Sequence, residues 1–248
     1  MRDGRRRGGR GLAVALAVLG LQAEGSATEF VRWTDSGFDS AEQRTLADAE
    51  LYPRGRPDAA YRLNLTVLFA RGTPWTQARA IRQIRLTAGI LQPCGIALGA
   101  VRLARLSLDS SQRRFNAEDA DPRTGVPAAV ATLASKLPPG SARPAIFLLG
   151  RIEGTKSLAV SYRAADEGSP VAPHFDTAWI SYPAHWLPRA DKHYSPLAHE
   201  LAHLLCRCGH TPSPTRHLLH ASRNYLSSHV LPEHCERFRG SGLLALTH

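Results

Sequence analysis

The chain has 248 residues, of which 43% are hydrophobic, and a formal net charge of +10. This composition supplies enough apolar surface for one sizeable core and excludes an intrinsically disordered chain. The basic residues are spread along the sequence without blocks or an interleaved glycine and aromatic pattern. We therefore expect a basic surface and no nucleic-acid partner.

The first 27 residues have the pattern of a secretory signal peptide. Five arginines precede an uncharged run at 11–21, and the small residues Gly25 and Ala27 offer a cleavage site. The apolar run is too short to span a bilayer, which takes about 20 residues. We therefore expect a secreted or periplasmic protein that has no membrane contact once residues 1–27 are removed.

Beyond residue 60 the apolar residues alternate between strand and helix periods. Strands are predicted at 61–70, 96–108, 145–149 and 177–182, and helices at 76–91 and 128–137. Residues 154–173 are predicted to form a loop. Strands that alternate with helices indicate an α/β (α+β) fold with a mostly parallel sheet.

The sequence HELAH at 199–203 lies on a predicted helix with well-marked ends. Ser195 is a good N-cap, Pro196 suits the first helical position, and Gly209 can take the left-handed conformation that closes a helix. His199 and His203 are four residues apart, so both lie on one face of the helix and can bind one metal ion.

The residue types in this motif are those of a hydrolytic zinc site. Glu200 is rotated by about 100° from His199 on the helix, so it can reach a metal-bound water without being a ligand. Zinc lowers the pKa of such a water to about 7, and a neighbouring carboxylate can accept its proton. The sequence therefore predicts Glu200 as the general base and one Zn²⁺ per chain.

A catalytic zinc ion usually has three protein ligands, so the two helix histidines leave one to be found. We favour His210, because Gly209 lets the chain reverse and bring this side chain back to the metal. Cys206 shares a face with His203 but stands about 10 Å from His199 along the axis. Further alternatives lie downstream, namely His217, His220, Glu233 and Glu236.

The four cysteines of an exported chain are expected to form two disulfides. Cys206 and Cys208 are two residues apart near the end of a helix, so their side chains should point in different directions. We therefore expect Cys94 and Cys235 each to pair with one of them, in either combination.

The run HELAHLLCRCGH resembles the extended motif HExxHxxGxxH of the metzincin-like zinc metallopeptidases. It departs from that motif in two ways: Cys206 replaces the glycine, and the last histidine, His210, comes one residue late. The family also has a methionine-containing turn below the zinc, and Leu219 occupies that position here. Leucine can fill a similar apolar volume.

The resemblance implies a twisted, mostly parallel sheet with an antiparallel edge strand, an active-site helix below the cleft and a small C-terminal subdomain. Residues 177–182 fit the edge strand that binds the substrate peptide in such enzymes. Tyr225 is a candidate for stabilising the developing oxyanion. We expect residues 28–60 to form an arm or short pro-segment and 61–248 the catalytic domain, with its lower part at 210–248.

The sequence thus predicts a secreted zinc metallopeptidase, with endopeptidase activity on peptide or protein substrates. One alternative is a secreted domain that binds zinc without productive catalysis. Another is a HExxH hydrolase in which a downstream carboxylate, such as Glu233, is the third ligand.

Overall fold

A computed structural model describes most of the chain beyond residue 42. The described residues are 43–108, 114–116, 128–135, 137, 141–153, 159–162, 176–183, 193–222 and 226–247. The expected signal peptide at 1–27, the first part of the expected arm and Tyr225 lie outside these ranges. Among the described residues, no helix is both long and apolar enough to cross a membrane.

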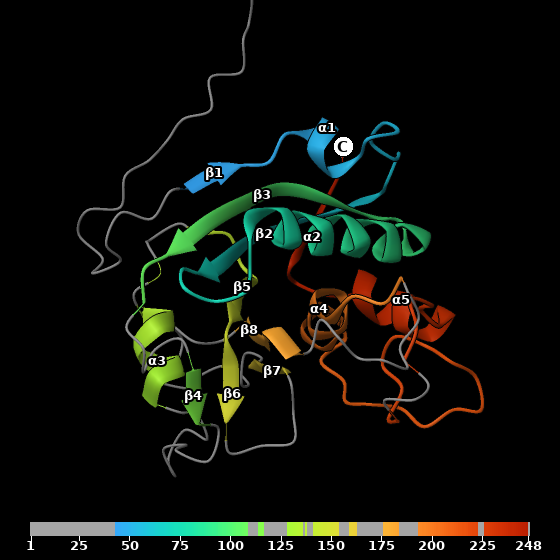
Figure 1. The fold of residues 1–248 in the computed structure, drawn as a ribbon. Coiled ribbons are helices and arrows are strands. Elements are labelled where there is room, and N and C mark those ends of the chain that lie inside the picture. The colour runs from blue at the N-terminus through green and yellow to red at the C-terminus, as the bar shows by residue number, and fades with distance from the viewer. Residues whose placement is uncertain are drawn as a thin grey trace, which may run out of the picture.

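A seven-stranded sheet forms the centre of the molecule, with the strands in the order β1-β3-β2-β5-β8-β7 and β9 added beside β2 (Figure 1). Its strands are β1 (Gln43–Thr45), β2 (Tyr61–Ala70), β3 (Ile96–Leu106), β5 (Ala145–Leu149), β7 (Ala159–Tyr162), β8 (Thr177–Ser181) and β9 (Leu244–Leu246). Neighbours among β3, β2, β5 and β8 run parallel, whereas β1 and β7 are antiparallel edge strands. The predicted mostly parallel sheet is confirmed.

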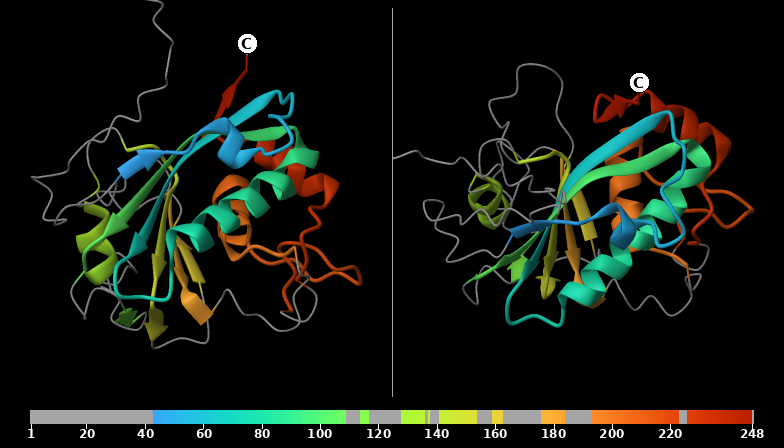
Figure 2. Two further views of the ribbon diagram at one scale, coloured as in Figure 1. Left: turned by 45° about the horizontal axis from the view of Figure 1, so that its top comes forward. Right: turned by 90° about the horizontal axis from the view of Figure 1, so that it is seen from above.

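Two smaller strands, β4 (Arg114–Asn116) and β6 (Arg151–Glu153), pair with each other outside this sheet. The helices are α1 (Asp48–Leu51), α2 (Gln77–Leu91), α3 (Ala128–Ser135), α4 (Pro196–Cys206) and α5 (Pro232–Arg239), with a 3-10 turn at Gln92–Cys94. α2 and α4 pack on one face of the sheet and α3 on the other (Figure 2). The helices predicted at 76–91 and 128–137 correspond to α2 and α3.

β2 shows why the sheet is covered on both faces. Alternate residues of a strand point to opposite faces. Leu63, Leu65 and Val67 accordingly enter the larger core with α2 and α4, whereas Leu68 and Ala70 enter the core with α3. A strand buried on both sides is typical of the middle of a parallel sheet.

The prediction that residues 177–182 form the edge strand is wrong. β8 lies between β5 and β7, and all five of its residues are buried. The edge strand is β7, which falls within the segment at 154–173 that was predicted to be a loop. The apolar, uncharged run of β8 suits an interior strand, because its backbone pairs on both sides and both its faces are covered.

Both described ends of the chain join the sheet. β1 pairs with β3, and Leu51 and Tyr52 just beyond it are buried in the larger core. At the other end, β9 pairs antiparallel with the start of β2. Residues 43–52 therefore pack against the body of the fold, and the last strand returns to it after α5.

The predicted disulfide pairing is also wrong. The structure pairs Cys94 with Cys235, which joins the 3-10 turn after α2 to α5, and pairs Cys206 with Cys208. The prediction expected the side chains of Cys206 and Cys208, near the end of the helix, to point in different directions. The helix instead ends at Cys206, and a reversal at Arg207 brings the two Cα atoms to 5.1 Å, within the usual range for a disulfide.

Candidate metal centre

α4 begins as the sequence predicts. The Ser195 side chain accepts a hydrogen bond from the Ala198 N–H at 3.2 Å, and Pro196 occupies the first turn. The Ser195 hydroxyl also donates to the Gln83 side-chain oxygen at 2.8 Å. This buried bond fixes the start of α4 to α2, which holds the helix in a defined position under the sheet.

The end of α4 differs from the prediction. Arg207, rather than Gly209, takes the left-handed conformation, with φ 49° and ψ 36°. The chain therefore turns back two residues earlier than expected. His210 follows this turn, and its ring lies next to those of the two helix histidines.

The structure brings together the three histidines that the sequence selected. The Nε2 atoms of His199 and His203 are 3.2 Å apart, and the Nε2 atom of His210 lies 3.0 Å from the first and 3.3 Å from the second. Among the described residues, this is the one group of three or more His, Cys, Asp or Glu side chains arranged to hold a metal ion.

Main-chain carbonyls hold two of these rings in place. The Nδ1 atom of His199 lies 2.7 Å from the Leu218 carbonyl oxygen, and that of His203 lies 2.8 Å from the Cys208 carbonyl oxygen. Only a protonated Nδ1 can donate to a carbonyl, so a neutral ring keeps its lone pair on Nε2. Burial, with the neighbouring histidines, lowers the pKa of His199 to about 3, which keeps this ring neutral.

The geometry fits a tetrahedral metal ion. Three nitrogens bound to zinc at about 2.0 to 2.1 Å are separated by about 3.3 to 3.4 Å in a tetrahedral arrangement. The observed separations of 3.0 to 3.3 Å are close to these values. Lone pairs that face one another at this distance repel unless a cation lies between them. Three neutral imidazoles with an open fourth position are a donor set typical of catalytic zinc.

Glu200 lies beside this group on α4 and is 5% exposed. Burial raises the pKa of Glu200 to about 8, and a hydrogen bond with the Ser161 side chain opposes part of that rise. Ser161 belongs to the edge strand β7. The carboxyl group is therefore oriented toward the strand at the edge of the sheet, and a nearby cation would favour its ionised form.

Comparisons with known proteins bear on the fold. No family model matches the chain, and no curated protein sequence matches it. A solved structure, metalloproteinase-II from Bacteroides fragilis, is similar with a TM-score of 0.50 and 13% sequence identity. The match covers 73% of this chain and 53% of that one, so the chain spans about half of that protein. At this identity the similarity shows a common fold and no more.

Within this metalloproteinase-like fold, the predicted turn residue Leu219 is fully buried in the larger core. Its carbonyl accepts a hydrogen bond from the Thr211 N–H at 2.9 Å, so the turn lies against the segment that follows His210. The neighbouring Leu218 supplies the carbonyl that holds His199. Sequence reasoning missed this contact, because a main-chain acceptor leaves no signature in the residue types.

Tyr194 was also missed. Its ring packs edge-on against His199, with 5.9 Å between the ring centroids. It comes directly before the N-cap of α4, where an aromatic residue has no special meaning in the sequence alone.

The other candidate ligands do not join the group. Cys206 is held in a disulfide and has no free thiolate. Glu233 and Glu236 are exposed on α5, and His217 and His220 are buried in a different cluster. His210 is thus the third side chain that the geometry favours.

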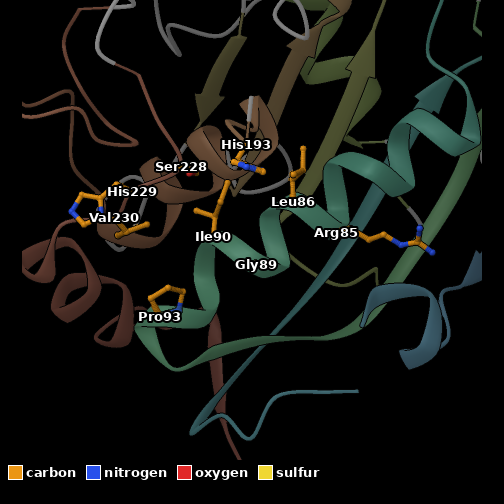
Figure 3. Close-up of a pocket in the computed structure, with 9 residues that line it drawn as sticks. All are labelled: Arg85, Leu86, Gly89, Ile90, Pro93, His193, Ser228, His229 and Val230. Carbon is orange, nitrogen blue, oxygen red and sulfur yellow. The ribbon is translucent and has the colours of Figure 1, made fainter. Parts of the chain in front are cut away.

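The described part of the chain also has a pocket of about 510 Å³ (Figure 3). Its walls come from the second half of α2 and from two other segments of the chain. The lining residues are Arg85, Leu86, Gly89, Ile90, Pro93, His193, Ser228, His229 and Val230. None of the metal-site residues lines it, so we do not assign it to the reaction.

Proposed function

We propose that the chain is an exported, metzincin-like zinc peptidase in which His199, His203 and His210 bind one Zn²⁺ and Glu200 is the general base. One observation supports this most strongly. Three Nε2 atoms converge within 3.3 Å while carbonyl oxygens hold the Nδ1 atoms of two of the rings. Such outer hydrogen bonds are typical of metal-binding histidines.

The residues of the chain divide the chemistry among them. Zinc, when bound, supplies a Lewis acid and a water whose pKa is about 7. The Leu218 and Cys208 carbonyls keep the rings of His199 and His203 in the orientation that binding requires. Glu200 accepts a proton from the attacking water and donates it to the leaving amine.

The edge strand β7 is our candidate for the substrate-binding strand, in place of β8. β7 pairs with β8 on one side, and within the described sheet its other side has no strand partner. A peptide can add to such an edge through main-chain hydrogen bonds. Because Ser161 of β7 contacts Glu200, a peptide bound at this edge would lie next to the general base.

The proposed location is outside the cytoplasm. Two disulfides in the described part of the chain are typical of an oxidising compartment. The residue pattern at 1–27 agrees with export. The proposed partner is a peptide or protein substrate.

A zinc-binding domain without peptidase activity is the second candidate. One observation favours it: the Glu200 carboxyl group is buried and hydrogen-bonded to Ser161. If this bond kept the carboxyl group away from the zinc-bound water, the site would bind zinc without hydrolysing peptides. A third candidate, with Glu233 as a ligand, loses support because Glu233 is exposed and outside the histidine group.

The Glu200→Gln variant separates the first two candidates. We expect it to keep one zinc ion per chain and to hydrolyse peptides about 10² to 10⁴-fold more slowly, the usual contribution of a general base. The measurement is digestion of a mixed peptide library, with zinc content determined on the same samples. Zinc-loaded wild-type protein that cleaves no peptide would favour the binding domain.

A further inference from the structure

The Cys206–Cys208 disulfide closes a very small ring at the C-terminal end of α4. We propose that this disulfide positions the metal site, by holding the reversed turn that places the Cys208 carbonyl against His203 and delivers His210. The inference rests on the proposed function only in taking the three histidines as metal ligands.

The turn that the disulfide spans is one that its central residue does not favour. Arg207 has a φ of 49°, and a side chain with a β-carbon destabilises this left-handed conformation. Glycine usually occupies such a position at the end of a helix. The disulfide keeps the Cα atoms of Cys206 and Cys208 at 5.1 Å with the second cysteine turned back toward the first. The covalent ring therefore holds Arg207 in the left-handed conformation. A glycine at this position would adopt that conformation without such a constraint.

Two of the three histidines depend on this turn. The Cys208 carbonyl oxygen lies 2.8 Å from the Nδ1 atom of His203, and His210 is two residues further along the chain. Apart from its two chain neighbours, nothing in the described structure lies within 4 Å of where a β-carbon on Gly209 would stand, so Gly209 is not packed against other parts of the fold. The ring thus constrains the chain on the α4 side of His210, while the hydrogen bond from the Thr211 N–H to the Leu219 carbonyl holds it on the other side.

The two disulfides differ in a way that supports a local role. Cys94 and Cys235 are 141 residues apart and both are buried, so their bond joins distant parts of the core. Cys206 and Cys208 are half-buried and two residues apart. Closing so small a loop restricts few conformations of the unfolded chain. We therefore expect the ring to affect metal affinity more than global stability.

The main test is the Cys206→Ser/Cys208→Ser double variant, with the other disulfide left intact. Its zinc dissociation constant, measured by competition with a chelator, should be about 10- to 100-fold higher than that of wild type, the usual effect of losing an outer-sphere partner. The melting temperature of the metal-free protein should change little. The visible spectrum of the Co²⁺-substituted variant should also differ, because the geometry of the nitrogen donors is less constrained.

Arg207 supplies a rescue and a matched control. Adding Arg207→Gly to the double variant should recover much of the lost zinc affinity, since glycine adopts the left-handed turn without strain. Adding Arg207→Ala removes the same side chain but keeps the β-carbon, and should give no recovery. A purely structural role for the disulfide would not produce this difference.

The ring can also be opened in folded wild-type protein, in case the double variant fails to fold. A phosphine reduces the half-buried disulfide: the phosphorus takes an oxygen atom from water, and the two hydrogens of that water end on the two sulfurs. Iodoacetamide then caps both thiols, and mass spectrometry verifies that Cys94 and Cys235 remain paired. The same rise in the zinc dissociation constant is expected.

A folded double variant with zinc affinity within twofold of wild type would overturn the proposal, as would a loss that glycine at 207 does not recover. These results leave the proposed function standing, because wild-type zinc binding and peptide cleavage are measured separately. Wild-type protein that binds zinc but cleaves no peptide would instead contradict the proposed function alone. Wild-type protein that binds no zinc would overturn both.

Discussion

Two clusters of three histidines lie in the last third of the chain, and only one is arranged for a metal. In the first cluster, His199, His203 and His210 direct their Nε2 atoms at one point. The second consists of His217, His220 and His234, whose ring centroids are 5.1 and 5.6 Å apart around His217. All three of these rings are buried.

The difference lies in where the ring nitrogens point rather than in the number of histidines. In the first cluster, carbonyl oxygens occupy Nδ1 and leave Nε2 available. In the second, both nitrogens of His220 are engaged: Nε2 donates to the Ser213 carbonyl at 2.6 Å and Nδ1 accepts from the Ser222 N–H at 2.9 Å. Neither nitrogen of the buried His217 has a hydrogen-bond partner, yet the three rings do not direct nitrogens at one point. A metal site thus needs histidine rings in which one nitrogen is hydrogen-bonded to the main chain and the other points at a common centre.

The largest expected effect is the loss of zinc when a ring of the first cluster is removed. His203→Ala should retain no stoichiometric zinc after dialysis, because two neutral ligands rarely hold a catalytic ion. His220→Ala should still bind one zinc ion per chain. Metal analysis of both folded variants tests the comparison, and zinc loss from the second variant alone would reverse our assignment.

The disulfide next to the second cluster should matter mainly for stability. Replacing Cys94 and Cys235 by serine frees a loop of 141 residues, and the chain-entropy model gives a loss of about 5 kcal/mol in unfolding free energy. Denaturant unfolding of the metal-free protein measures this. A loss no greater than that of the Cys206→Ser/Cys208→Ser variant would contradict the division of roles between the two disulfides.

The smallest expected effect concerns acid stability. Burial lowers the pKa of His234, so the unfolded state binds a proton more readily than the folded state as the pH falls below about 6.5. His234 therefore makes the protein less stable at acid pH. His234→Phe, beside the ring of Phe238, should reduce the decline in unfolding free energy between pH 6.5 and 5, by less than about 1.4 kcal/mol per pH unit. An unchanged pH slope would show that another group dominates.

The first cluster could be predicted from sequence because its spacing carries geometric information. Residues four apart on a helix share a face, which places His199 next to His203 whatever surrounds them. His210 followed from the expectation of a chain reversal, although the reversal occurs at Arg207 instead of Gly209. A left-handed arginine has no sequence signal, and this single residue also explains the wrong disulfide prediction.

The sheet edge was harder to predict. β7 is a strand of four residues whose pairing with β8 depends on the tertiary structure, so its sequence resembles a loop. β8 was predicted as a strand, but its position in the sheet depends on the strands that pair with it and cannot be derived from its own residues. The Leu218 and Cys208 carbonyls are likewise invisible in the sequence, since every residue has a carbonyl.

In the proposed peptidase, His199, His203 and His210 hold one zinc ion. X-ray absorption at the zinc edge of the loaded wild-type protein tests it most directly. We predict three imidazole nitrogens and one oxygen at about 2.0 to 2.1 Å, with no sulfur ligand. A sulfur contribution near 2.3 Å, or a six-coordinate shell of oxygens without imidazole scattering, would contradict the account.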